Sequence, residues 1–123
     1  MRRATLAVVL ALALAASPAS SAAPNPERLL VTADEWSLVL SKRKLDPGKA
    51  IVELYNRGED AHDVRIKRGG RSRYVPIPET GSEESNRVET RFKRGKRYVL
   101  WCSLAGHREL GMEAELRVAK PRR

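Results

Sequence analysis

Apolar and polar residues alternate in short stretches along most of this 123-residue chain, and each alternation predicts a β-strand with one buried face. In the segment 35–41, for example, Trp36, Leu38 and Leu40 fall on the same face. Further extended segments follow with little sign of a helix, at 49–55, 62–66, 73–78, 88–92, 96–102 and 113–118. We therefore expect a domain built from strands alone, starting near residue 29.

Turn-forming residues separate these segments. Proline and glycine mark a turn at 45–48, a polar turn covers 56–60, and a glycine pair interrupts the chain at 69–70. Two prolines in 73–78 restrict that segment to a sheet edge or a loop, because proline cannot donate to a central ladder. Seven to eight short strands with such turns predict an antiparallel β-sandwich. The pattern alone does not reveal how the strands connect.

The N-terminus has the pattern of a secretory signal peptide. A cationic start is followed by an apolar stretch over 4–16 and then by small residues, so we expect a signal peptide at 1–22 with cleavage after Ala22. The alternative is an uncleaved membrane anchor, but an apolar stretch of about thirteen residues is short against the roughly twenty that a spanning helix needs. The protein is thus expected to be exported, to the periplasm, the cell envelope or the extracellular space. The remaining chain divides into a linker at 23–28, one domain at 29–119 and a basic tail at 120–123.

The chain is strongly basic, with a formal net charge of +9. Loss of Arg2 and Arg3 with the signal peptide leaves about +7, which favours acidic partners and speeds encounters with them at low salt. Nucleic acid is a poor partner for an exported protein whose basic residues are scattered over strands. We expect a monomer that does not insert stably into a membrane.

Cys102 is the only cysteine of the chain, and an unpaired thiol is unusual in an exported protein. Such a thiol must be reactive, paired between molecules or occupied. His107 and Met112 follow Cys102 at C-x4-H-x4-M spacing, and His62 is the only other histidine. A thiolate, two imidazoles and a thioether form a soft donor set that suits copper better than magnesium, calcium or manganese. Metal ligation would explain the lone thiol.

Each of these residues also has an ordinary structural explanation. Cys102 could be a small buried residue at the end of a strand, and Met112 could fill a gap in the core. His107 could lie on the surface, and His62 could bond to the backbone in a turn. The joint pattern favours copper, because a loop between two strands can wrap three donors around one point. Gly106 and Gly111 precede two of the donors and give that loop freedom.

The chain resembles the cupredoxins, the family of plastocyanin, azurin and rusticyanin, over nearly the whole expected domain. The resemblance rests on the early strand 36–40, the segment LDPGKAIVELYNRGEDAH at 45–62 and the C-terminal segment 98–118. It implies a Greek-key β-sandwich with one bound copper. It also implies a set of copper ligands, three equatorial and one axial: His62, Cys102 and His107, with Met112 as the axial ligand.

Two positions depart from the family pattern. Asp63 stands where an asparagine often follows the first histidine and ties the two ligand segments together. A carboxylate cannot donate the hydrogen bonds of an amide, and its charge near copper would favour the oxidised state. Glu113 stands where glycine often follows the methionine.

These observations predict a type 1 (blue) copper protein that carries single electrons between redox partners, one of them an acidic protein. His107, among small and apolar loop residues, is the expected point of electron exchange. An exported copper carrier without an electron-transfer role would need the same ligands, so that alternative remains. A copper oxidase or reductase would need further histidines, and the chain contains no other motif for catalysis, so we expect no enzyme.

Overall fold

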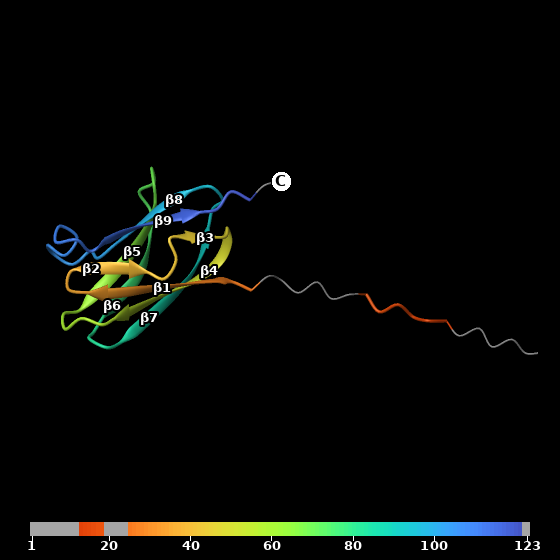
Figure 1. Cartoon of the computed structure of the whole chain (residues 1–123), viewed down its shortest axis with the longest axis horizontal. Helices are drawn as coiled ribbons and strands as arrows, with labels where there is room; N and C mark the ends of the chain where they lie inside the picture. The colour runs from red at the N-terminus through yellow and green to blue at the C-terminus, as the bar shows by residue number, and fades with distance from the viewer. Residues whose placement is uncertain (1–12, 19–24, 122–123) are drawn as a thin grey trace, which may run out of the picture.

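The computed structural model describes residues 13–18 and 25–121, and residues 27–118 fold into two packed β-sheets (Figure 1). Most of the expected signal peptide, including the cleavage site after Ala22, lies outside the described residues. The described part of that segment, 13–18, is exposed and carries no helix or strand. Within the described residues no helix is long and apolar enough to cross a membrane.

The sheets contain four and five strands. In spatial order the first consists of β2 (Ser37–Leu40), β1 (Glu27–Asp34), β4 (Gly48–Asn56) and β7 (Ser85–Phe92). The second consists of β3 (Lys44–Leu45), β9 (Glu113–Val118), β8 (Arg97–Trp101), β5 (His62–Arg68) and β6 (Tyr74–Thr80). The chain passes repeatedly from one sheet to the other, as expected for a Greek-key sandwich. The predicted all-β class is confirmed.

The strand pairing differs from the purely antiparallel prediction in two places. β1 pairs with β4 in parallel, and β3 pairs with β9 in parallel. The first pair is parallel because the chain leaves β1 through the β1–β2 hairpin, crosses to the other sheet as β3 and returns as β4 in the direction of β1. Nine strands are present among the described residues, against seven to eight expected. The two that the predicted segments do not include are β1 and β3, and β3, with two residues, is too short to show an alternation.

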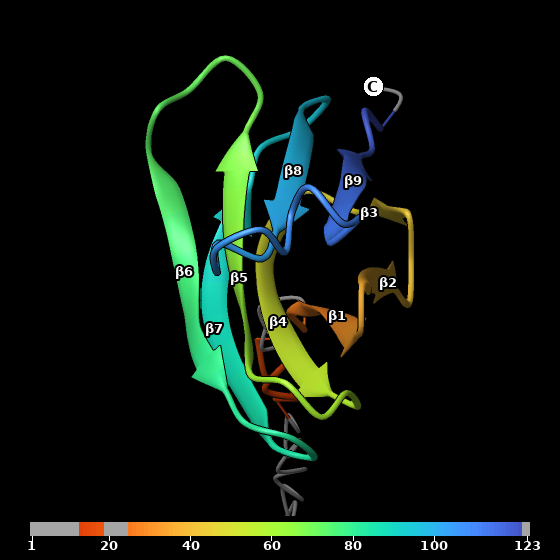
Figure 2. The same ribbon diagram turned by 90° about the vertical axis from the view of Figure 1, so that its left-hand side faces the viewer.

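The core lies between the sheets and is filled by the alternating apolar residues of both. Val31 and Ala33 of β1, Leu54 of β4, and Leu100 and Leu116 of β8 and β9 are fully buried. The proline-containing strand β6 lies at the edge of the five-stranded sheet, as its sequence predicts, and Figure 2 shows it beside β7, the edge of the other sheet.

The sandwich brings the predicted ligand segments to one end. β4 and β8 run toward this end, and β5 and β9 start from it, since β8 is antiparallel to both β5 and β9. The 56–61 turn and the 102–112 loop therefore lie at the same end of the molecule.

Candidate metal centre

The structure places each predicted ligand at the end of a strand or in the loop between two strands. His62 is the first residue of β5, Cys102 directly follows β8, and Met112 directly precedes β9. All three side chains are fully buried, whereas His107, within the 102–112 loop, is partly exposed. Because His62, Cys102 and Met112 are buried at the ends of strands, the sheet fixes the positions of these three residues.

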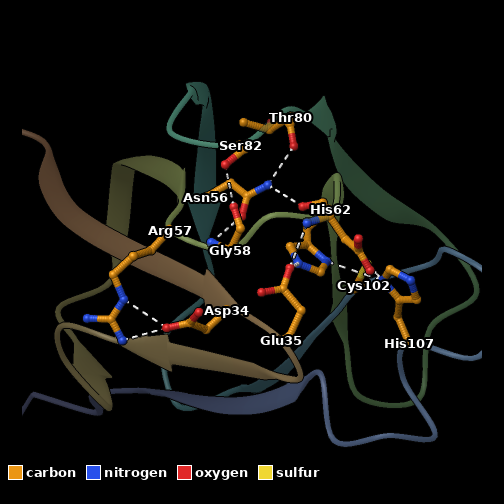
Figure 3. Close-up of polar contacts among 11 residues, drawn as sticks. Asp34, Glu35, Asn56, Arg57, Gly58, His62, Thr80, Ser82, Cys102 and His107 are labelled. Atoms are coloured by element: carbon orange, nitrogen blue, oxygen red, sulfur yellow. Dashed lines mark hydrogen bonds and ion pairs between the residues drawn. The ribbon is translucent and has the colours of Figure 1, made fainter.

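Three of the four residues bring donor atoms together. Nδ1 of His62 lies 3.2 Å from Nδ1 of His107, and Sγ of Cys102 lies 3.5 Å from the same His107 nitrogen. All three donor atoms lie within 4.8 Å of one another, and Figure 3 shows the side chains pointing toward one another. Nitrogen and sulfur ligands bind a metal such as zinc at about 2.0–2.3 Å, so donors that share one ion stand roughly 3–4 Å apart. The spacing of this group is thus that of a metal site.

Backbone hydrogen bonds close the 102–112 loop around this group. The N–H of Cys102 donates to the carbonyl of Met112 (3.1 Å), and the N–H of Met112 donates to the carbonyl of His107 (3.2 Å). Gly111 has a φ of 125°, and a Cβ at this position would lie 3.0 Å from the carbonyl oxygen of Trp36. The loop therefore requires glycine here. The backbone of Met112 is thus hydrogen-bonded to both Cys102 and His107. The role of the Met112 side chain as axial ligand stays a prediction.

Glu35 holds the ring of His62 from the opposite side. Its Oε1 accepts a hydrogen bond from the N–H of Asp60 (2.8 Å) and lies 3.1 Å from Nε2 of His62. The bond from Asp60, with a contribution from His62, lowers the pKa of Glu35, so this carboxyl is ionised at neutral pH. An ionised carboxylate only accepts, so Nε2 must carry the hydrogen. This leaves the Nδ1 lone pair directed at His107, in the form that binds a metal.

Asp63 connects the two ligand segments. Its carboxylate accepts a hydrogen bond from the N–H of Ser103 (2.6 Å) and another from the Ser103 hydroxyl. Asp63 follows His62, and Ser103 follows Cys102, so these bonds tie the ligand positions to each other. The aspartate therefore connects the two segments without donating a hydrogen bond, because its carboxylate accepts from Ser103.

Burial raises the pKa of the Cys102 thiol, against the opposing effect of hydrogen bonds from the backbone of Asp63 and Leu104. A thiol with a raised pKa is protonated at neutral pH. A bound cation would compensate the thiolate charge and displace the proton. The sulfur is thus set up for a metal ion rather than for nucleophilic attack by a free thiolate.

The turn that carries His62 is fixed by Asn56, the last residue of β4. Its fully buried amide group donates to the carbonyls of Asp60 (2.7 Å) and Thr80 (2.9 Å) and accepts from the N–H of Gly58 (2.9 Å) (Figure 3). These three bonds use both donor hydrogens of the amide and one acceptor site of its oxygen. They set the path of the chain into β5.

Trp36 covers the group from the β1–β2 connection. Its ring packs edge-on against His107, with centroids 4.7 Å apart, and against His62 at 6.1 Å. Sequence reasoning assigned Trp36 to a strand face and gave Glu35 no role. Nothing in the sequence marks Glu35, since it lies far along the chain from His62 and its position depends on strand pairing.

Comparison with known proteins shows the fold. No family model matches the sequence, and no curated protein matches it. Among solved structures, auracyanin B is 16% identical with a TM-score of 0.64, over 80% of this chain and 93% of that chain. Auracyanin A, a "blue" copper protein from the bacterium Chloroflexus aurantiacus, is 16% identical with a TM-score of 0.63, over 76% and 99%. A multi-copper oxidase from Pediococcus acidilactici is 17% identical with a TM-score of 0.57, over 93% of this chain but only 30% of the oxidase. At these identities the likeness concerns the fold, which is that of the cupredoxins.

Proposed function

We propose that this chain is an exported blue copper protein that carries single electrons, with His62, Cys102 and His107 as equatorial ligands and Met112 as the axial ligand. The convergence of two imidazole nitrogens and one sulfur within 4.8 Å supports this most directly. Soft sulfur and imidazole donors in this combination favour copper. The signal-peptide pattern at 1–22 supports export.

Copper would supply the one-electron Cu(I)/Cu(II) couple. The chain holds the donors in place: Glu35 fixes the ring of His62, and Asp63 fixes the segment of Cys102 through Ser103. Contacts of this kind orient ligands and tune the metal. A donor set held by buried strand ends needs little rearrangement when its charge changes, which favours rapid electron transfer.

His107 is the proposed point of electron exchange, since it is the one donor residue that is partly exposed. Leu110, on the same loop, is 58% exposed and adds apolar surface for brief docking. The guanidinium of Arg108 is bonded to Glu113 (3.1 Å), so the attraction of an acidic redox partner rests more on the general positive charge than on this residue.

The burial of the donors also favours electron transfer over copper carriage. His62 and Cys102 are fully buried, so release of a metal ion would require the ligand loop to open. A carrier would lose copper readily to an added chelator. We expect this protein to retain copper in both oxidation states during repeated cycles of reduction and oxidation, measured by optical titration in the presence of a chelator.

The first test is addition of Cu(II) to the purified protein, with an intense blue thiolate-to-copper absorption as the expected result. Cys102→Ser should abolish the band. Leu110→Ala changes an exposed side chain of the same loop and should leave the band in place. A band that persists in Cys102→Ser would refute the ligand assignment.

A further inference from the structure

A cavity lies between the edge strands β6 and β7, at the end of the sandwich away from the candidate metal centre. It has a volume of about 480 Å³. The strand β5 leads from His62 at the metal centre to Arg68 at this cavity, and seven residues of extended chain place the two sites ~20 Å apart. The connection between β5 and β6, at the top of Figure 2, supplies part of the wall.

The rim of the cavity is cationic. Five basic residues line it, and no acidic residue does: Arg68, Arg71, Arg73, Arg91 and Lys93. Some cations elsewhere in the described part of the chain form ion pairs with carboxylates, as Lys42 does with Glu27 and Arg57 with Asp34. None of the five rim cations takes part in an ion pair among the described residues. Their mutual repulsion would be relieved by a bound anion.

The floor of the cavity is apolar. The buried side chains of Ile66, Phe92 and Tyr98 reach it, together with the half-buried Val75. The hydroxyl of Tyr98 already accepts the N–H of Lys93 (2.9 Å), so the ring presents apolar surface to the cavity. A small inorganic anion would interact with the basic residues of the rim and leave the apolar floor in contact with water.

We propose that this cavity binds a single amphipathic organic anion, with its apolar body between the sheet edges and its carboxylate, sulfate or phosphate head at the arginines. Arginine suits such heads because its planar guanidinium donates two parallel hydrogen bonds to them. The anion binds as a free molecule rather than as part of a membrane, since the apolar surface is recessed between the strands and does not project. The site is independent of copper.

The test measures binding of three probes to the purified protein by isothermal titration calorimetry: decanoate below its micelle concentration, acetate and inorganic phosphate. We expect decanoate to bind at least tenfold more tightly than either small anion, because only decanoate covers the apolar floor. Equal affinity for phosphate and decanoate would overturn the proposal, since it would reduce the site to a cluster of charges.

Variants locate the site. The triple variant Arg68→Gln, Arg71→Gln, Arg73→Gln should weaken decanoate binding at least tenfold. The matched control removes three exposed cations that do not line this cavity: Arg28→Gln, Arg43→Gln, Lys44→Gln. The control should change the affinity less than twofold. An equal loss in both variants would refute the site, because binding would then follow net charge alone.

Vesicles distinguish the free anion from a membrane. We expect the triple rim variant and the charge-matched control variant to sediment equally with phosphatidylglycerol vesicles, because both have lost three positive charges. Rim-dependent binding to these vesicles without any binding of decanoate would overturn the proposal in favour of a lipid surface.

Discussion

Replacement of Asn56 by alanine should weaken the fold and the metal centre together. The change removes three hydrogen bonds of a fully buried side chain, to the backbone of Gly58, Asp60 and Thr80. A buried hydrogen bond contributes about 1 kcal/mol net, and polar groups left without partners cost more. We therefore expect the free energy of unfolding to fall by about 3–5 kcal/mol, a large part of the 5–15 kcal/mol typical of a domain.

Urea unfolding of the metal-free protein, followed by tryptophan fluorescence, measures this loss. For a domain of this size a loss of 3 kcal/mol corresponds to a fall in Tm of roughly 12–24 °C. Asn86→Ala is the matched control: its side chain is partly buried and makes one hydrogen bond, to the hydroxyl of Thr80, so we expect about 1 kcal/mol. Equal losses for the two variants would refute the reasoning that Asn56 organises the turn.

Three further predictions concern the charges and ligands. Glu35→Gln retains a group that can accept a hydrogen bond from His62 and removes a negative charge beside the proposed copper. The reduction potential measured by voltammetry should therefore rise. A lower potential would contradict the role of Glu35. Met112→Leu should keep the blue colour and raise the potential, because a weak donor to Cu(II) is lost, and an unchanged value would exclude Met112 as axial ligand. Lys42→Gln should cost about 0.2–1 kcal/mol at pH 7, since Lys42 lowers the pKa of the partly exposed Glu27. A lowered pKa stabilises the fold above the unfolded-state pKa, so the cost in urea unfolding should shrink as the pH falls through the lowered pKa of Glu27. A cost at pH 2 as large as at pH 7 would argue against this pair.

Local pattern was enough to predict β2 and β4 to β9, but not β1 or β3, because alternation follows directly from burial of one sheet face. Leu38, Val52 and Leu116 lie on buried faces as their spacing predicts. The parallel pairing of β1 with β4 could not be read in the same way. This pairing depends on the chain crossing to the other sheet as β3 between β2 and β4. The two residues of β3 are too few to show an alternation of apolar and polar positions.

Part of the candidate site was predictable, because only a few residues of this chain can provide nitrogen or sulfur ligands for a metal. His62, Cys102 and His107 are scarce in this chain, so their convergence could be expected before their distances were known. Glu35 could not be found, since the chain has many acidic residues and only strand pairing places this one beside a histidine. The hydrogen bonds that Asp63 accepts come from Ser103, and the sequence does not show that these two residues are close in space.

The complete burial of Cys102 has a consequence for the folded chain before the proposed metal binds. Oxidants and other thiols attack a cysteine according to its exposure and its thiolate character, and this sulfur offers neither. Two copies of the folded protein therefore cannot cross-link through it, and an alkylating reagent should modify it only as fast as the ligand loop opens. Folding thus protects the sulfur from oxidation, although Cys102 has no disulfide partner.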